Sequence, residues 1–423
     1  MTTLTVDDSR TEVRAFLAEA WDPDLTVAQW WERLGESGWA APTWPLEWFG
    51  KGLGRDAAAI VNDELRAAGA IGGPSGLGML LAGPTILAHG TEEQKERYLR
   101  PIVTGQEGWC QLFSEPGAGS DLASLQTKAE RDGDEWIING QKVWTSGGQV
   151  AELGMLLART DPDAPKHKGI SYFAFPMEQA GVEVRPLREM TGRALFSEVF
   201  FDDARVRGDA LIGGENKGWI VANTTLANER AGLGSGGGGA GGAAFPGRKA
   251  GMLEVRVGEL GERTSRSGVQ PANFGRAFGL LRTIAEKVGR SDDPIIRQRL
   301  VDLYSMNEVG RITGLRIKGA LASGRGPGPE ANTAKLMMSR ICRLVRDLGP
   351  ELLGPEAMIT GSDTTGGGVV QELVLFAPAP SIYGGSDEIQ KNIIGERVLG
   401  LPKEPGPDKS TPFRELKVGT QSA

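Results

Sequence analysis

The sequence predicts an α+β protein with three folded parts: an N-terminal helical domain, a central antiparallel β barrel or sandwich, and a C-terminal helical bundle. Apolar residues recur at helical spacing before about residue 105, alternate with polar residues from Trp109 to Ile212, and return to helical spacing after Lys217. We expect domains over residues 1–107, 108–215 and 216–402, and a tail over 403–423. A chain of 423 residues has room for two or three domains.

The composition argues against several classes of function. There are 47 Lys and Arg against 54 Asp and Glu, and the resulting net charge of −7 disfavours nucleic-acid binding. Two Cys and two His disfavour a disulfide framework, a metal site and a Ser-His-Asp hydrolase. The N-terminus has no signal-peptide pattern, and there is no apolar run of the roughly 18 residues that a membrane-spanning helix needs. We therefore expect a cytoplasmic protein that has no membrane span and binds no metal.

The N-terminal part is expected to be helical. Thr91–Gln94 has the form of a capping box, which predicts a helix that runs through Tyr98 and stops before Pro101. We interpret His89, just before this cap, as a structural residue. Four apolar residues near the start fall at helical spacing: Val13, Phe16, Leu17 and Ala20.

The central part carries strand signals. Asn139-Gly140 predicts a type I′ hairpin turn between strands at Trp136–Ile138 and Val143–Trp144, because such a turn needs positive φ at both central residues. Further strands are expected over residues 155–158, 170–175 and 198–201.

The C-terminal part is expected to be helical from Lys217 to about Leu399, with breaks at Gly232–Gly242 and Gly324–Pro329. Residues 232–237 match the dinucleotide-binding glycine pattern. They follow a helical segment instead of a strand, so we interpret them as a flexible break.

A final helix is expected between Ser386, as N-cap, and Gly400, which Pro402 follows. The tail after Lys403 is polar and Pro-rich, and we expect it to lie on a surface of the protein.

Three motifs stand out from this background. Gln111–Asp121 reads QLFSEPGAGSD, a strand that enters a Gly-rich turn whose N–H groups can face an anion. Lys142–Ser146 reads KVWTS, and Ile382–Gln390 reads IYGGSDEIQ. Together with the order helices, β domain, helices, these motifs resemble the signatures of the acyl-CoA dehydrogenase family from about residue 8 to 402.

The resemblance implies a site for FAD between the β domain and the C-terminal helices. It places Phe113 and Ser114 at the edge of the isoalloxazine, Trp144 packed on the flavin, and Thr145 and Ser146 hydrogen-bonded around it. The alternative is that Trp144 fills the core and Ser114–Pro116 is an ordinary turn. The full set of implied cofactor neighbours is Gln111, Phe113, Ser114, Gly119, Ser120, Trp144, Thr145, Ser146, Ser386, Asp387 and Glu388.

The implied reaction removes two hydrogens across Cα–Cβ of an acyl-CoA thioester and needs a carboxylate to take the α proton. Many family members have Glu directly after the Tyr of the C-terminal signature, where this chain has Gly384. Isovaleryl- and long-chain-type members carry the base on an earlier helix, and the matching segment here contains Glu229. On a helix that starts near Gly218, Glu229 shares one apolar stripe with Trp219, Ala222, Leu226 and Leu233, so desolvation is expected to raise its pKa. Alternatively, Glu229 pairs with Arg230 or another cation.

The substrate neighbours implied by the resemblance are Ser120, Arg230 and Gly384, whose N–H could hold the thioester oxygen. Two other family segments are altered. Arg276 matches only loosely the family motif by which a neighbouring subunit touches FAD. Glu351–Pro355 resembles the family's flavin-adenine segment but has Pro355 where Gly is usual.

The implied partners are an acyl-CoA and an electron-transfer flavoprotein or similar acceptor. We expect a homo-oligomer, a dimer or tetramer, although a hetero-oligomer is possible. Two alternatives stay open. The chain could be a non-catalytic or half-site subunit of a hetero-oligomeric acyl-CoA dehydrogenase, or a flavin oxidase or monooxygenase on the same fold.

Overall fold

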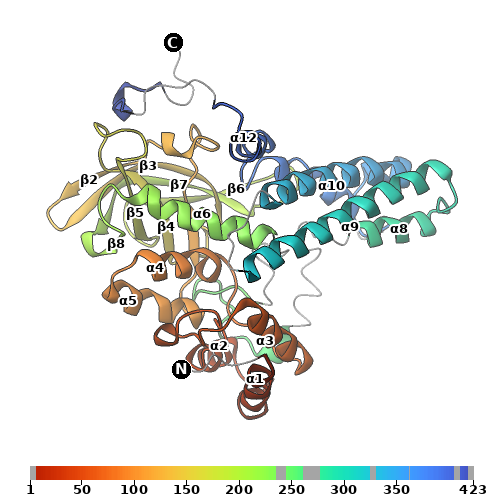
Figure 1. Ribbon diagram of the computed structural model, residues 1–423, viewed down its shortest axis with the longest axis horizontal. Coiled ribbons are helices and arrows are strands. Elements are labelled where there is room, and N and C mark those ends of the chain that lie inside the picture. Colours follow the sequence, from red (N-terminus) through yellow and green to blue (C-terminus); the bar gives the residue numbers. More distant parts are fainter. Residues whose placement is uncertain are drawn as a thin grey trace.

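The computed structural model describes residues 6–234, 244–260, 277–323, 330–361, 363–403 and 410–417. Three parts follow one another along the chain, as the sequence predicts (Figure 1). Helices come first, a β domain second and a group of long helices last.

The N-terminal part consists of five α-helices. Thr91 caps the fifth with the expected capping box, in which Thr91 and Gln94 exchange side-chain hydrogen bonds with backbone N–H groups. The predicted stop before Pro101 is wrong, because the helix ends at Val103 with Pro101 inside it. The helices are α1 (Val6–Ala20), α2 (Val27–Glu36), α3 (Arg55–Ala67), α4 (Gly83–His89) and α5 (Glu92–Val103).

The β domain is one eight-stranded sheet. Its strands are β1 (Trp109–Leu112), β2 (Lys128–Asp132), β3 (Glu135–Ser146), β4 (Leu153–Arg159), β5 (Ile170–Pro176), β6 (Val182–Leu187), β7 (Phe196–Arg207) and β8 (Leu211–Ile212). The order is β6-β7-β3-β2-β4-β5-β8, with β1 beside β4. Of the two expected forms, a barrel or a sandwich, a closed barrel is not formed: within the described strands the sheet is open, with β6 and β8 at its edges. The expectation of antiparallel pairing holds except that β4 pairs in parallel with β1 and β2.

The hairpin predicted at Asn139-Gly140 is also wrong, because β3 runs through both residues without reversing. The chain reverses earlier, in the hairpin that joins β2 to β3 between Asp132 and Glu135, where Gly133 has φ 62°. Asn139 and Gly140 instead mark an irregularity in the pairing of β3 with β7. A residue pair that favours positive φ serves equally well at a bulge, so the dipeptide alone does not fix a turn.

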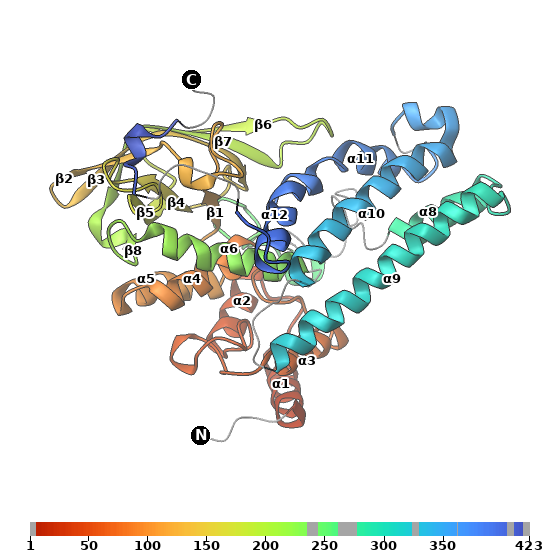
Figure 2. The same cartoon turned by 45° about the horizontal axis from the view of Figure 1, so that its top comes forward.

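The described residues of the C-terminal part form six α-helices: α6 (Gly218–Gly234), α8 (Ala277–Lys287), α9 (Pro294–Ala322), α10 (Glu330–Leu353), α11 (Val369–Phe376) and α12 (Asp387–Arg397). Helix α6 lies against β5 and α4, whereas α9 and α10 run side by side away from the sheet (Figures 1 and 2). Most of the Gly232–Gly242 break and the Gly324–Pro329 break lie outside the described residues.

The expectation of continuous helix after Lys217 fails for residues 244–260, which are mostly non-helical. They return to the N-terminal helices, where Leu253, Val255 and Val257 join their buried core. The N–H of Val27, at the start of α2, donates to the Val255 carbonyl at 2.8 Å. Leu253, Val255 and Val257 are two residues apart and are separated by exposed residues, so the apolar pattern of this segment is that of an extended chain and not that of a helix.

The buried apolar residues in the described part of the chain form three clusters. The largest joins the β domain to α4, α5 and α6. A second fills the C-terminal helices, and a third fills the N-terminal helices. Helix α6 thus shares the core of the sheet even though it follows the β domain in sequence.

Candidate active site

The first motif begins where β1 ends and is held by a buried carboxylate. Glu115 accepts hydrogen bonds from the backbone N–H groups of Gln126 at 2.6 Å and Thr127 at 2.9 Å. Burial alone would raise the pKa of Glu115, but Lys142 and these donors together hold it below its usual value. The turn from Ser114 to Ala118 is therefore fixed to the following segment by a charged group.

The partner of Glu115 comes from the second motif. Lys142 on β3 is fully buried, and its Nζ donates to a Glu115 carboxylate oxygen at 2.8 Å and to the Phe113 carbonyl at 3.0 Å. Burial lowers the pKa of Lys142, and Glu115 opposes the shift. The N–H of Val143 also donates to the Ser114 carbonyl at 2.9 Å. The structure thus brings the first two motifs together side by side.

We did not predict the Glu115–Lys142 pair, although the sequence contained a signal for it. Lys142 falls on the same inward phase of β3 as the buried Trp136 and Ile138. A lysine at an inward position needs a buried acceptor, because an isolated charge in the interior is costly.

Trp144 has an unusual conformation for a strand residue. Its φ is 61°, a region that side chains other than Gly seldom adopt, and 56% of the residue is exposed. One edge of the indole meets Phe196 at a centroid distance of 5.9 Å. The alternative in which Trp144 fills the core is therefore wrong.

The residues that follow Trp144 alternate in burial. The Thr145 hydroxyl is buried and has no hydrogen-bond partner among the described residues. Ser146 is exposed. An exposed indole beside an unsatisfied hydroxyl is an arrangement that a flat, polar ligand could complete.

Helix α6 begins at Gly218 as expected and carries Glu229. Its buried face includes Val221, Ala222 and Thr225, while Glu229 itself is only half-buried. The side-chain amide of Gln111, on β1, donates to a Glu229 carboxylate oxygen at 3.4 Å. Two residues predicted for the site from distant parts of the sequence therefore meet. Arg230 follows, but its side chain lies outside the described residues, as does Arg276.

Buried hydroxyl contacts hold α6 against α4 close to Glu229. Thr85 and Thr225 share a hydrogen bond of 2.9 Å, one turn before Glu229. His89 Nε2 and the Thr224 hydroxyl lie 2.7 Å apart. Burial lowers the pKa of His89, so a neutral imidazole suits this contact, and the structural interpretation of His89 is consistent with it.

The third motif forms the turn before α12. Gly384 and Gly385 both have positive φ, at 63° and 83°, and a Cβ on Gly385 would lie 2.7 Å from the Gln390 side-chain nitrogen. Ser386 is the N-cap, as predicted, and its hydroxyl accepts from the Ile389 N–H at 3.3 Å.

Asp387 points from this turn to α10. Its carboxylate accepts from the Ser339 hydroxyl at 2.7 Å, from Arg343 at 2.9 Å and from Lys335 at 3.3 Å. Burial alone would raise the pKa of Asp387, but these donors outweigh it and hold the pKa below its usual value. Glu388 is exposed, with Lys391 4.0 Å away. Asp387 therefore joins two helices, and α10 in turn contacts α6.

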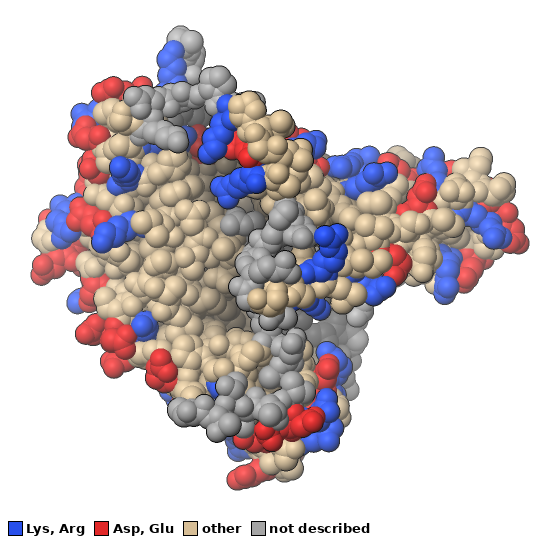
Figure 3. Space-filling view, viewed as in Figure 1, with Lys and Arg blue, Asp and Glu red and all other residues tan. Residues whose placement is uncertain are grey.

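Figure 3 shows a broad face with few charged side chains over the β domain and α6, with charged residues gathered at its rim. Gly119 and Ser120 are exposed, and Ser114 is partly buried. The first motif thus combines a buried anchor with an accessible glycine-rich turn.

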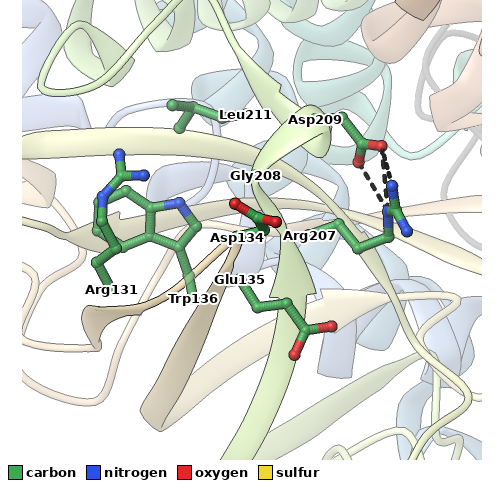
Figure 4. A pocket seen from close by; sticks show the side chains of 8 residues that line it. All are labelled: Arg131, Asp134, Glu135, Trp136, Arg207, Gly208, Asp209 and Leu211. Carbon is green, nitrogen blue, oxygen red and sulfur yellow. Dashed lines mark hydrogen bonds and ion pairs between the residues drawn. The ribbon is translucent and has the colours of Figure 1, made fainter.

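A separate cavity of about 530 Å³ lies at the turn between β2 and β3, beside the end of β7 (Figure 4). Arg207 and Asp209 at its rim pair at 2.7 Å, and the Arg131 guanidinium lies over the Trp136 ring at 4.5 Å. None of the residues predicted for the site lines this cavity. Arg131, Glu135, Arg207 and Asp209 are already paired, so we assign this cavity no role.

The described residues offer neither a metal site nor a membrane-spanning helix. They contain no group of three His, Cys, Asp or Glu placed to hold a metal ion. No described helix is both long and apolar enough to cross a membrane.

The fold and the motifs together define a class: an α+β enzyme scaffold in which a β domain with paired signature strands is flanked by helical domains. Three family models match in the same order. They are the acyl-CoA dehydrogenase N-terminal domain over residues 6–106, the middle domain over 110–204 and the C-terminal domain over 261–399. The chain belongs to the acyl-CoA dehydrogenase family.

Individual relatives agree with this assignment. Acyl-CoA dehydrogenase IpdE1 of Mycobacterium tuberculosis is 38% identical over 381 residues, which cover 89% of this chain and 88% of the relative. Acyl-CoA dehydrogenase FadE34 of the same organism is 37% identical over 88% of this chain and 46% of its own length.

Among solved structures, the "Tcur3481-Tcur3483 steroid ACAD" is similar with a TM-score of 0.71 and 28% identity, covering 94% of this chain and 98% of that one. The ChsE4-ChsE5 complex from Mycobacterium tuberculosis is similar with a TM-score of 0.68 and 28% identity, covering 96% and 99%.

Proposed function

We propose that this protein is an FAD-dependent acyl-CoA dehydrogenase that converts an acyl-CoA into the 2-enoyl-CoA, with Glu229 as the base. Family membership supports the reaction. The observation that carries the assignment of the base is the contact between Gln111 and Glu229. It sets the carboxylate beside the strand that leads into the first motif, and the second motif is hydrogen-bonded to that turn.

The residues present fit a flavin. Trp144 offers an exposed aromatic face, and the buried Thr145 hydroxyl needs a partner. In this proposal Trp144 packs on the ring, while Phe113, Ser114 and Ser146 lie at its edge. Gly119 and Ser120 would contact the pyrophosphate and the thioester-linked tail. The turn at Ser386–Glu388 would complete the cofactor surroundings. Bound FAD would supply the acceptor for the hydride that leaves Cβ.

The chain's own residues handle the proton and the developing charge. Glu229 takes the proton from Cα, which leaves electron density on the thioester oxygen as the Cα–Cβ double bond forms. The N–H of Gly384 is proposed to donate to that oxygen, where it would stabilise enolate-like charge. Its positive φ, 63°, is a conformation that Gly adopts without strain. Arg230 and Ser120 are proposed to bind the substrate.

The proposal is tested with Glu229→Gln. We expect the variant to bind FAD but to lose anaerobic bleaching of the flavin by acyl-CoA by about a thousandfold or more, because the first proton transfer lacks its base. Glu254→Gln changes an exposed carboxylate outside the motifs and is the matched control. Near-normal bleaching in Glu229→Gln would remove Glu229 from the mechanism.

We propose that the chain forms an oligomer through the exposed face of α9. Five apolar residues are about half-exposed on one face of this helix: Val301, Tyr304, Val309, Ile312 and Leu315. This stripe supports association of the chain with a second copy or a related subunit. Light scattering of the purified protein distinguishes a dimer or tetramer from a monomer.

A second candidate function is a half-site subunit of a hetero-oligomer. Gly384 in place of Glu favours it, and two similar solved structures are named as pairs of proteins. If the chain purifies alone as a yellow, FAD-loaded homo-oligomer that acyl-CoA bleaches, this candidate fails. Rapid reoxidation of the reduced protein by oxygen would favour an oxidase, whereas transfer to an electron-transfer flavoprotein would favour a dehydrogenase.

The identity of the acyl group that the enzyme accepts is to be determined by titration. One similar structure is described as a steroid enzyme. An anaerobic titration should therefore compare steroidal with short, long and branched acyl-CoAs, and a carrier-protein thioester should be included.

A further inference from the structure

The C-terminal segment Ser410–Lys417 lies on the β domain, as expected for a surface arm (Figure 1). The N–H of Phe413 donates to the Ala164 carbonyl, and the N–H of Arg414 donates to the Pro162 carbonyl, both at 3.0 Å. The Arg414 side chain pairs with Asp163. The segment therefore docks on the connection between β4 and β5.

The ring of Phe413 covers a buried cation. Phe413 is 9% exposed, and its centroid lies 3.6 Å from the guanidinium carbon of Arg159, the last residue of β4. Arg159 is itself only 4% exposed. A planar guanidinium stacked on an aromatic face is a favourable contact, and it also keeps water from one side of the charge.

Arg159 in turn holds the segment that directly follows the first motif. One of its terminal nitrogens donates to the carbonyls of Ala123 at 2.7 Å and Leu125 at 3.3 Å, and the other donates to the Lys166 carbonyl at 2.7 Å. Lys166 Nζ reaches Asp121 at 2.5 Å. The guanidinium thus ties the segment after Ser120 to the connection on which the C-terminal arm sits.

The same segment is held from its other end by Glu115, through the N–H groups of Gln126 and Thr127. A buried anion therefore holds two backbone donors, and a buried cation holds two backbone acceptors a few residues away. Water that reached either charge would compete for these hydrogen bonds and weaken them. Glu115 is shielded by the protein interior, whereas Arg159 is shielded in part by Phe413.

We propose that Phe413 is a positioning residue: by covering Arg159 it fixes the turn that presents Gly119 and Ser120. The functional part of this inference rests on the proposed acyl-CoA dehydrogenase activity, in which that turn binds the cofactor and the substrate tail. Burial lowers the pKa of Arg159 to about 10, which agrees with strong exclusion of water from the guanidinium.

The structural part is tested by hydrogen exchange of the purified holoenzyme. In Phe413→Ala we expect exchange of the amides of residues 121–127 and 161–168 to speed up by about tenfold, a factor that corresponds to about 1.4 kcal/mol. Amides of α10, which does not touch this region, should not change. Phe413→Trp should exchange at the wild-type rates. Phe413→Leu should exchange at rates between those of wild type and Phe413→Ala, because leucine covers the cation without an aromatic face.

Arg414→Ala is the matched control. It removes the exposed pair with Asp163 while leaving the ring on Arg159, so exchange near residues 121–127 should stay within about twofold of wild type. Equal exchange in wild type and Phe413→Ala, or an equal rise throughout the protein, would overturn the inference.

Kinetics test the functional part. Phe413→Ala should raise KM for the best acyl-CoA by about five- to tenfold while kcat changes by less than about twofold, since Glu229 lies on another element. Faster exchange with unchanged KM would overturn the functional role of Phe413. Faster local exchange in a protein without dehydrogenase activity would refute the proposed function but leave the clamping of the turn established.

Discussion

Two buried carboxylates, Glu115 in the β domain and Asp387 at the start of α12, solve the same electrostatic problem in different ways. Glu115 is neutralised by Lys142 and by two backbone N–H groups. Asp387 is neutralised by side chains alone, with Lys335 and Arg343 as its cations. Backbone donors fix the shape of a loop, whereas side-chain donors from another helix fix the spacing between helices.

The cations also differ in their access to water. The side chain of Lys142 is completely buried, whereas of the two cations at Asp387 Lys335 is 8% exposed and Arg343 is 41% exposed. A charge left alone after mutation can be solvated at the second site more easily than at the first. Disrupting the two sites should therefore cost different amounts of stability.

Lys142→Met gives the largest expected effect. It leaves the Glu115 carboxylate buried without its cation, and we expect a loss of about 3–5 kcal/mol in the free energy of unfolding. Urea unfolding followed by fluorescence measures the loss, and FAD content measures damage to the first motif.

The double variant Lys142→Met, Glu115→Met is the control for this experiment. It removes both charges and should recover part of the stability lost in Lys142→Met. A loss below about 1 kcal/mol in the single variant would mean that water enters the site, and the contrast with Asp387 would then disappear.

Asp387→Asn should have a smaller effect. The amide keeps the shape of the side chain, but it weakens the hydrogen bonds from Ser339 and the two cations, and we expect a loss of about 1–3 kcal/mol. Glu388→Gln, the exposed neighbour, should cost less than about 0.5 kcal/mol. Chemical unfolding at neutral pH measures both.

The pH dependence of this difference has a definite sign. The pKa of Asp387 is lower in the folded protein than its usual value, so its charge contributes stability above the unfolded pKa, about 3.9, and loses this contribution as the pH falls through the folded pKa. The stability gap between wild type and Asp387→Asn should therefore shrink below about pH 4. A gap that widens in acid would contradict the assigned shift.

The contrast also explains what sequence reasoning could reach. Motif spacing and local capping rules found the order of the domains, the capping box at Thr91 and the N-cap at Ser386, because each depends on neighbours within a few residues. Whether the sheet closes and the path of residues 244–260 both depend on long-range packing: the sequence left a barrel and a sandwich open, and the helical expectation for residues 244–260 failed. The buried ion pair of Lys142 was not predicted, because its acceptor, Glu115, lies 27 residues earlier in the chain.

The candidate site divides along the same line. The resemblance named Gln111 and Glu229 separately, and the structure brings the two side chains together. The clamp of Phe413 on Arg159 had no sequence signal, since neither residue belongs to a motif and they meet only through the fold. Roles on FAD and acyl-CoA for the named residues stay predictions until a ligand is bound.

A smaller effect on stability than that of Lys142→Met or Asp387→Asn is expected from Trp144→Gly, which separates the demands of folding from those of binding. Glycine adopts a φ of 61° without the strain that Trp144 carries, and the lost indole is more than half-exposed, so little packing is lost. We expect the free energy of unfolding to change by less than about 1 kcal/mol. The affinity for FAD should nevertheless fall by about tenfold or more, because the aromatic face has gone.

Trp144→Phe keeps a smaller ring on the strained backbone and should retain more of the affinity for FAD than Trp144→Gly. Dilution-induced loss of flavin absorbance compares the two variants. If Trp144→Gly instead unfolds readily while holding FAD normally, then the indole serves the fold through its edge contact with Phe196, and the strain at this position has no link to cofactor binding. We expect the first outcome, because the strained Trp144 lies next to the Thr145 hydroxyl, which is buried and has no partner among the described residues. Backbone strain of this kind is typical of ligand-binding sites.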